Sequence, residues 1–498
     1  MILVIDGHPY LYEMESLCDI FFPYEKVTVV YETSHDDDLV VYTGYKEEND
    51  EAHLHISVKL DGQFLEKRDV FSFSEPNFEK QCSLKMAVML HELLVSLTGY
   101  RPHWGVLIGV RPIKLLRKLT AEMGQAQATA YFSNNLLVSK EKVQLSVRTM
   151  HNEQPILSAS RPESFSLYIS IPFCPTRCAY CSFVAQSTEK TAKLIPRYVD
   201  LLCEELMYTA QVAKRCQLRL ETVYMGGGTP TTLTAQQMAQ VIDTVYTHFD
   251  MYTCGEFTIE AGRPDTITAE KLQVMKERGI TRISINPQTL NDDVLKLIGR
   301  GHTVKQIYDA FALARTIGFN NINMDLIVGL AGDSIESFHR TLHGVTDLNP
   351  ESITVHTLSL KRSSKINQNG KVHFINDGYS ADQMLRYVDR VLTEKEYFPY
   401  YLYRQSRMVG NLENTGWAKP GFENFYNVYI MDETHTILAC GAGAVSKIKH
   451  PYEDKLQRIF NFKFPYEYID RYQEMLNRKE IVVSMYQQFR QSSAKFTT

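Results

Sequence analysis

Apolar runs alternate with amphipathic runs between residues 167 and 397, and this alternation restricts the fold more than any other feature. The apolar runs, typical of strands buried on both faces, are 167–173, 222–227, 256–262, 282–288, 321–330 and 352–360. Apolar residues at helical spacing follow them over 195–210, 235–249, 269–279, 303–318, 334–349 and 381–397. Such strand–helix repetition predicts right-handed crossovers and a parallel sheet. Six units predict an incomplete, open barrel.

The segments on either side of this region have other patterns. Before it, the sequence predicts strands over 27–31, 39–42 and 53–60 and a helix over 82–97. Two prolines among small polar residues predict a linker, or a lead-in to the next domain, over 152–164. The aromatic-rich last hundred residues predict a small α+β domain. The predicted organisation is therefore an N-terminal α/β extension (1–160), an α/β partial (βα)6 barrel (161–380) and a C-terminal substrate-capping domain (381–498).

Composition excludes several classes of protein. With 44% hydrophobic and 22% charged residues, the chain can bury a core and is not wholly disordered. The net charge of −5 gives no overall attraction to nucleic acid. No apolar run reaches the roughly 20 residues of a membrane span, and no basic segment precedes the first apolar run. Nine cysteines, an odd number, argue against a disulfide framework and favour a cytoplasmic protein.

Three of the nine cysteines fall within eight residues, in Cys174-Pro-Thr-Arg-Cys178-Ala-Tyr-Cys181, directly after the first predicted barrel strand. Barrel active sites are built from the loops at this end of the strands. A structural zinc site normally takes four protein ligands, and no second cysteine pair or nearby histidine supplies the fourth. Three thiolates therefore predict a centre with one open coordination position, such as a [4Fe–4S] cluster with one iron free.

Other polar and glycine-rich elements follow at the ends of the later strands. The second strand ends in Gly226-Gly227-Gly228-Thr229-Pro230, where glycine lets the backbone approach a ligand closely. Glu260, Gln288 and Asp325 lie at or near later strand ends, where barrels contact their ligands. An aspartate in an apolar strand is costly unless paired. Arg300 offers a bidentate fork for a carboxylate.

These residues together carry a resemblance to a known family. The segment YISIPFCPTRCAYCSF resembles the cluster loop of radical S-adenosylmethionine (SAM) enzymes, and its YxxIPFC start resembles the oxygen-independent coproporphyrinogen III oxidase-like family. WGVLIGVRPIK and YLYRQSRMVGNLEN are similar to the HemZ branch of that family. The resemblance covers roughly 165–447. It implies a radical SAM oxidoreductase with a [4Fe–4S] cluster on Cys174, Cys178 and Cys181, whose open iron chelates SAM.

The resemblance also implies a reaction and a set of contacts. One electron, from a flavodoxin- or ferredoxin-type donor, cleaves SAM to methionine and a 5′-deoxyadenosyl radical. The radical then acts on a tetrapyrrole, converting coproporphyrinogen III to protoporphyrinogen IX in anaerobic haem biosynthesis. The SAM contacts implied are Tyr168, Tyr180, Gly227, Gly228, Thr229, Glu260, Gln288, Arg300 and Asp325. Cations suited to the four propionates of the substrate are Lys361, Arg362, Arg404 and Arg407.

Two departures from the family pattern leave alternatives open. Ser170 stands where the oxidases have histidine, and Ser182 and Phe183 stand where a further cysteine follows the motif. The proton or electron route and the use of a second SAM therefore stay open. One alternative is a haem-binding chaperone of the same family, although Tyr426-Asn427 replaces the start of the carriers' HNxxYW element. Others are a radical SAM enzyme that methylates and opens another tetrapyrrole, and a purely structural cluster.

Overall fold

A computed structural model describes residues 1–23, 25–32, 37–49, 51–73, 76–359 and 378–494 of the chain. The chain divides into two compact units. The smaller comprises Met1–Met150 with Asp377–Asp382 and Leu402–Glu413; the larger comprises His151–Asn376, Gln383–Tyr401 and Asn414–Thr498. Within the described ranges, no helix is both long enough and apolar enough to cross a membrane.

The larger unit is built on one 11-stranded sheet in the order β14-β15-β13-β12-β11-β10-β9-β6-β16-β17-β18. Neighbouring strands from β13 to β6 run parallel. These strands are β6 (Ser164–Ile171), β9 (Arg219–Gly227), β10 (Glu256–Glu260), β11 (Arg282–Ser284), β12 (Ile322–Val328) and β13 (Ser352–Thr357). Each lies within or overlaps a predicted strand, so the α/β class and the parallel sheet are confirmed.

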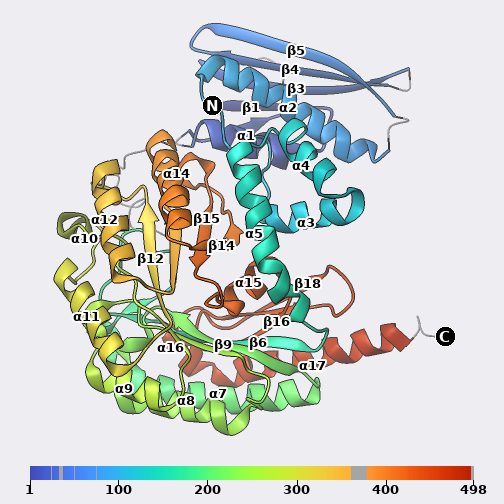
Figure 1. Cartoon of the computed structure of the whole chain (residues 1–498). Helices are drawn as coiled ribbons and strands as arrows, with labels where there is room; N and C mark the ends of the chain where they lie inside the picture. Colours follow the sequence, from blue (N-terminus) through green and yellow to red (C-terminus); the bar gives the residue numbers. More distant parts are fainter. Residues whose placement is uncertain (24, 33–36, 50, 74–75, 360–377, 495–498) are drawn as a thin grey trace. The chain divides into compact units, whose positions relative to one another are not determined.

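A helix follows each of these strands, as predicted. The helices are α7 (Ile195–Arg215), α8 (Ala235–His248), α9 (Ala269–Glu277), α11 (Val304–Ile317), α12 (Ile335–Leu348) and α14 (Gly378–Glu394). Local chemistry sets their ends: Thr234 and Thr303 form capping boxes at the starts of α8 and α11. Gly318, with φ +100°, ends α11. Helices α7 and α8 pack together along one side of β6 and β9 (Figure 1).

The C-terminal strands extend this sheet at both edges. β14 (Phe398–Tyr403) and β15 (Asn414–Ala418) continue it beyond β13, to which β15 is antiparallel. β16 (Thr436–Cys440) pairs parallel with β6, and β17 (Val445–Lys449) and β18 (Leu456–Phe460) follow it. All five residues of β16 are buried. The strand that leads into the cysteine loop is therefore an interior strand of the sheet.

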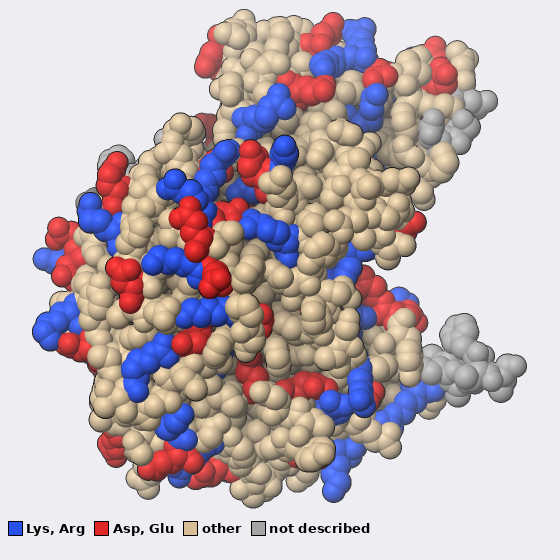
Figure 2. All heavy atoms as spheres, in the orientation of Figure 1, with Lys and Arg blue, Asp and Glu red and all other residues tan. Residues whose placement is uncertain are grey.

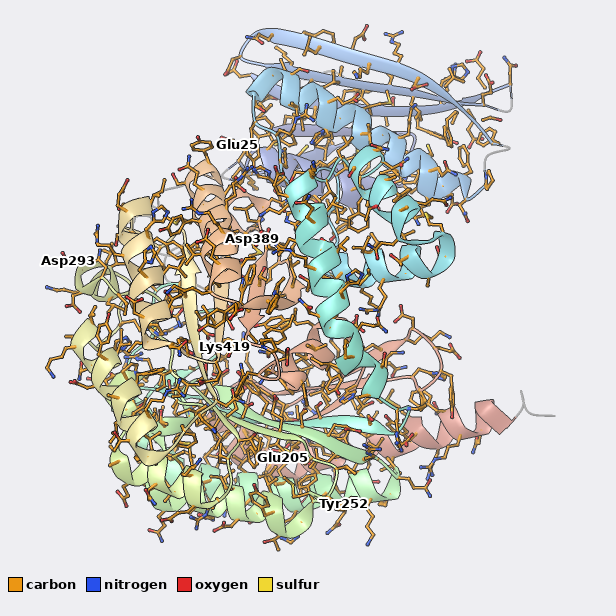
Figure 3. The ribbon with its side chains drawn as sticks, viewed as in Figure 1. Glu25, Glu205, Tyr252, Asp293, Asp389 and Lys419 are labelled. Atoms are coloured by element: carbon orange, nitrogen blue, oxygen red, sulfur yellow. The ribbon has the colours of Figure 1, made fainter. Side chains whose placement is uncertain are left out.

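A buried ion pair joins the C-terminal helices to this sheet. Lys479 of α17 (Tyr472–Ala494) lies 2.9 Å from Glu205 of α7, and both side chains are almost fully buried. The other Glu205 oxygen accepts from the Gly441 N–H and from the Tyr468 hydroxyl, each at 2.7 Å. Figure 3 shows Glu205 on the side of α7 that faces the sheet. These bonds fix α17, α16 (Pro465–Asp470) and the turn after β16 to α7.

The smaller unit contains a five-stranded sheet in the order β2-β1-β3-β4-β5. Its elements are β1 (Ile2–Asp6), β2 (Thr28–Val30), β3 (Leu39–Glu48), β4 (Glu51–Leu60), β5 (Gln63–Ser72), α1 (Leu11–Phe21), α2 (Phe78–Thr98), α3 (Pro112–Met123) and α4 (Gln125–Asn134). The predicted strands over 27–31, 39–42 and 53–60 and the predicted helix over 82–97 are confirmed.

The predicted linker over 152–164 is wrong for its first half. Residues up to 159 complete α5 (Lys140–Ala159), which continues through Pro155. Ile156 is buried, and its carbonyl accepts from the Tyr429 hydroxyl at 3.3 Å. Tertiary packing thus supports a helix where the proline alone predicts a break.

The visible surface mixes both signs of charge. Lys and Arg lie among Asp and Glu over the face drawn in Figure 2, where the described residues form no large patch of one sign. This distribution agrees with the small net charge of −5.

Candidate active site

The cysteine motif forms a loop between β7 (Phe173–Cys174) and β8 (Gln186–Ser187), directly after β6. Its three cysteines are free thiols; Cys178 is buried, and Cys174 and Cys181 are partly exposed. Burial raises the pKa of the Cys174 thiol to about 11 and also raises that of Cys181. These thiols therefore keep their protons at neutral pH unless a bound metal displaces them.

Neighbouring elements hold the loop and supply donors to its sulfurs. The Ala179 N–H donates to the Ile298 carbonyl, and the Thr176 hydroxyl donates to the Gly299 carbonyl, each at 2.9 Å. The Thr229 hydroxyl donates to Cys174 Sγ at 3.3 Å. Donors that point at sulfur stabilise thiolates, so the loop is suited to thiolate ligation.

Three thiols on one loop are a donor set that fits an iron–sulfur cluster. Among the described residues, no three His, Cys, Asp or Glu side chains converge closely enough for one metal ion. A [4Fe–4S] cluster binds its cysteines through separate irons, so its ligands do not need to meet at one point.

The glycine motif packs directly against the cysteine strand. The Gly228 N–H donates to the Ile171 carbonyl, and the Thr229 N–H to the Phe173 carbonyl, each at 2.8 Å. A Cβ on Gly228 would lie 2.6 Å from the Phe173 oxygen, and Gly227 has φ +104°. Only glycine permits this close approach at Gly228 and this backbone conformation at Gly227. The structure thus brings three predicted SAM contacts beside Cys174.

Two of the predicted acidic contacts have different surroundings. Burial raises the pKa of Glu260 to about 7, and its carboxylate accepts from the Tyr224 hydroxyl at 2.6 Å. Asp325 accepts from the Asn323 amide at 2.7 Å and lies 3.8 Å from His356 Nε2. Burial opposes the ionisation of Asp325, but His356 and Asn323 outweigh it, so the pKa of Asp325 is lowered. At neutral pH, Asp325 is ionised and Glu260 is poised between its two forms.

The predicted carboxylate-binding arginine is paired with a predicted tyrosine contact. Arg300 donates through Nε and Nη2 to the Tyr180 hydroxyl, at 3.2 and 2.9 Å. Its Nη1 donates to the Gly262 carbonyl at 2.9 Å. Gln288 is buried, has φ +69°, and donates its N–H to the Asp325 carbonyl at 2.9 Å. This uncommon conformation for a residue with a side chain is typical of functional sites.

Tyr168 belongs to a stack of three tyrosines. Its ring centroid lies 6.3 Å from that of Tyr224 and 6.2 Å from that of Tyr426. Tyr224 and Tyr426 are 4.6 Å apart. Because Tyr224 also donates to Glu260, the stack is continuous with the acidic part of the site.

The structure accounts for the departure at Ser170. The Ser170 hydroxyl donates to the Ala442 carbonyl at 2.8 Å, and a Cβ on Gly227 would lie 2.9 Å from its oxygen. The turn after β16 and the glycine motif therefore enclose the side chain, and the larger imidazole of histidine would displace one of them. Phe183, after the second departure at Ser182, is 61% exposed.

The structure does not bring together the four residues predicted to contact the propionates, as far as the described residues show. Lys361 and Arg362 lie outside the described residues. Arg404 belongs to the smaller unit, is buried, donates to the Leu107 carbonyl, and lies over the Trp104 ring. Arg407 belongs to the same unit and has Nη2 4.0 Å from Asp19. Packing within the smaller unit therefore already engages both arginines.

Sequence reasoning missed three residues of the site: Tyr224, Arg263 and His356. Tyr224 and His356 lie near the ends of barrel strands, which is the signal that identified Glu260. Arg263 follows β10, and its Nη1 lies 3.8 Å from Cys178 Sγ. Nothing in its local sequence indicates this contact.

Comparison with known proteins agrees with this geometry. The radical SAM superfamily profile matches residues 168–344. The chain is 37% identical over 477 residues to the oxygen-independent coproporphyrinogen-III oxidase-like protein HemZ of Bacillus subtilis (strain 168), which covers 94% of each chain. The chain belongs to this radical SAM family. Family membership confirms the resemblance, with a [4Fe–4S] cluster and SAM as its cofactors, and the superfamily match supports an enzyme.

Two further relatives place the chain within the family. The heme chaperone HemW of Bacillus subtilis (strain 168) is 32% identical over 284 residues, which are 56% of this chain and 70% of HemW. The solved structure of coproporphyrinogen III oxidase (HemN) from Escherichia coli is 25% identical, with a TM-score of 0.51, over 65% of this chain and 73% of HemN. The family thus contains both oxidases and chaperones, and the fold is that of a radical SAM protein.

Proposed function

We propose that this protein catalyses the oxygen-independent oxidative decarboxylation of coproporphyrinogen III to protoporphyrinogen IX, in the cytoplasm and as part of haem biosynthesis. The observation that carries the proposal is the similarity to HemZ along 94% of both chains, since the similarity to HemW covers only 56% of this chain. The tetrapyrrole substrate and a flavodoxin- or ferredoxin-type donor belong to the same proposal.

In this proposal, Cys174, Cys178 and Cys181 hold the cluster. When bound, the cluster and SAM supply a 5′-deoxyadenosyl radical. Arg300, already oriented by Tyr180, binds the SAM carboxylate, and the backbone of the glycine motif binds its amino group. Tyr168, Gln288, Glu260 and Asp325 complete the contacts.

The substrate step removes a hydrogen atom from a propionate side chain. Loss of CO₂ and of one electron to an acceptor then leaves a vinyl group, and two such decarboxylations give the divinyl product. Lys361 and Arg362, which follow the last barrel strand in sequence, are the proposed cations for the remaining propionates. The assignment of residues 381–498 to substrate capping belongs to this proposal.

A second candidate, a haem chaperone, draws support from the similarity to HemW. In this chain, Tyr426 is 4% exposed and stacks on Tyr224. A tyrosine packed in this way is a poor axial ligand, because haem would have to displace the stack. This observation favours the enzyme.

An anaerobic turnover assay tests the proposal. Reconstituted protein is incubated with SAM, a reductant and coproporphyrinogen III, and 5′-deoxyadenosine and the divinyl product are measured. We expect both products. SAM cleavage without decarboxylation contradicts the proposed substrate, and stoichiometric haem binding without turnover supports the chaperone.

Two cysteine variants, one inside the motif and one outside it, serve as controls for the assay. Cys178→Ala should abolish cluster absorbance and SAM cleavage, because one of three ligands is lost. Cys254→Ala, which removes a partly exposed cysteine from a position outside the motif, should change neither. Full SAM cleavage by Cys178→Ala contradicts the assignment of the ligands.

A further inference from the structure

Arg263 makes several hydrogen bonds to the cysteine loop. Arg263 is 3% exposed, and its guanidinium forms a bidentate pair with Asp265, with Nε to Oδ1 at 3.1 Å and Nη2 to Oδ2 at 3.2 Å. The remaining donors turn to the loop. Nη2 donates to the Thr176 hydroxyl at 3.1 Å, and Nη1 to the Thr176 carbonyl at 3.4 Å.

The same Nη1 lies 3.8 Å from Cys178 Sγ, within reach of a weak hydrogen bond to sulfur. Cys178 is the most buried of the three motif cysteines. A buried positive charge therefore lies against one thiol of the cluster motif. Asp265 is 19% exposed, and it keeps the guanidinium in this orientation.

We infer that Arg263 is a positioning residue that raises the reduction potential of the cluster, with Asp265 setting the strength of its effect. The inference rests on the proposed ligation by Cys174, Cys178 and Cys181. Reduction moves one electron from the reductant to the cluster, which gains one negative charge, and no proton has to move. A nearby cation stabilises the reduced form more than the oxidised form, and N–H donors to sulfur act in the same direction.

Removing the charge of Arg263 and removing the charge of Asp265 should shift the reduction potential of the cluster in opposite directions. Arg263→Met removes a positive charge, so the midpoint potential should fall. Asp265→Asn removes a negative charge and leaves Arg263 in place, so the potential should rise. Arg263→Lys keeps the charge without the bidentate fork and should recover part of the loss. A residue that only supports the loop has no reason to give shifts of opposite sign.

The experiment is an anaerobic redox titration of the reconstituted protein with dithionite, followed by electron paramagnetic resonance, with iron and sulfide measured in each variant. For Arg263→Met we expect a roughly tenfold lower ratio of reduced to oxidised cluster at a fixed potential, which corresponds to 59 mV for a one-electron couple. For Asp265→Asn we expect a smaller shift in the opposite direction.

A surface pair provides the matched control. Arg278 donates through Nε and Nη2 to Asp243, at 2.8 and 3.0 Å, in the same bidentate geometry but on the outer helices. Arg278→Met and Asp243→Asn should leave the potential unchanged.

Three outcomes decide between the alternatives. Shifts of the same sign in Arg263→Met and Asp265→Asn, or no shift at full iron content, overturn the inference. If Arg263→Met takes up no cluster, the signs in Asp265→Asn and Arg263→Lys decide it. A wild-type protein with no cluster contradicts the proposed ligation itself, and the inference falls with it.

Discussion

Two ion pairs in the larger unit, each with a buried cation, have similar chemistry but different neighbours. Lys479–Glu205 lies between α17 and α7, where its other partners are backbone groups and neutral side chains such as Gly441 N–H and the Tyr468 hydroxyl. Arg263–Asp265 lies against the cysteine loop, where its other partners include a thiol. The comparison teaches that the role of such a pair depends on the atoms its remaining donors reach.

The largest effect should come from Lys479–Glu205, the pair with no hydrogen bond to a motif cysteine. Lys479→Met leaves Glu205 buried without its cation, and we expect a loss of about 3–5 kcal/mol in the free energy of unfolding. Urea denaturation measures it. Lys455→Met is the control, because its pair with Glu453 is exposed to solvent and should contribute little to stability. Similar losses in the two variants would contradict the view that Lys479–Glu205 is structural.

An intermediate effect, with a defined pH dependence, should come from the acidic part of the site. Burial raises the pKa of Glu260 in the folded protein to about 7, above its usual value near 4.5. Between these two values the folded state keeps the Glu260 proton that the unfolded state has lost. The stability that this difference contributes is fully present below pH 4.5 and is lost as the pH rises through 7.

Glu260→Gln should accordingly stabilise the cofactor-free protein at pH 8, by about 1–3 kcal/mol, and have little effect at pH 5. Thermal or urea unfolding at the two pH values measures the difference. Glu277→Gln, on the exposed surface of α9, should show no such difference. Equal effects of Glu260→Gln on stability at both pH values would show that folding does not raise the pKa of Glu260.

The smallest effect should come from a single donor to sulfur. Thr229→Val keeps the shape of a buried side chain but removes the hydroxyl that donates to Cys174, and we expect a loss of about 1 kcal/mol in stability. It should also lower the cluster potential by less than Arg263→Met, because no charge is removed. Thr229→Ser should restore both quantities. An unchanged potential in Thr229→Val would show that the Thr229 hydroxyl does not tune the cluster, and that only the charged pair Arg263–Asp265 does.

The sequence was sufficient for the regular part of the fold. The barrel strands are continuous apolar runs with helices at the expected spacing, and such local patterns survive packing. The position of the cysteine motif after β6 followed directly from that order. The prediction was wrong where the local signal was misleading. Pro155 indicated a break in the helix, but contacts of Ile156 and Asn152 with distant residues keep α5 helical.

Partners far apart in the sequence were beyond prediction. Nothing local pairs β6 with β16, or places Leu402–Glu413 in the smaller unit, where the Trp104 indole donates to Glu413 at 2.8 Å. The contact of Arg263 with Cys178 spans 85 residues and joins two loops. Such contacts depend on the assembled sheet, so the sequence indicated the chemistry of the site more completely than its supporting residues.

The parallel pairing of β6 with β16 has a consequence for the order of synthesis. Ser170 and Ala442, which meet beside the glycine motif, are 272 residues apart. Because synthesis runs from the N-terminus, the cysteines leave the ribosome long before β16, the strand that pairs with β6. The three thiols therefore lie next to an unfinished edge of the sheet until β16 has been made. Cluster insertion into a properly formed loop is expected to be one of the last steps in making the protein, after the chain has passed residue 442.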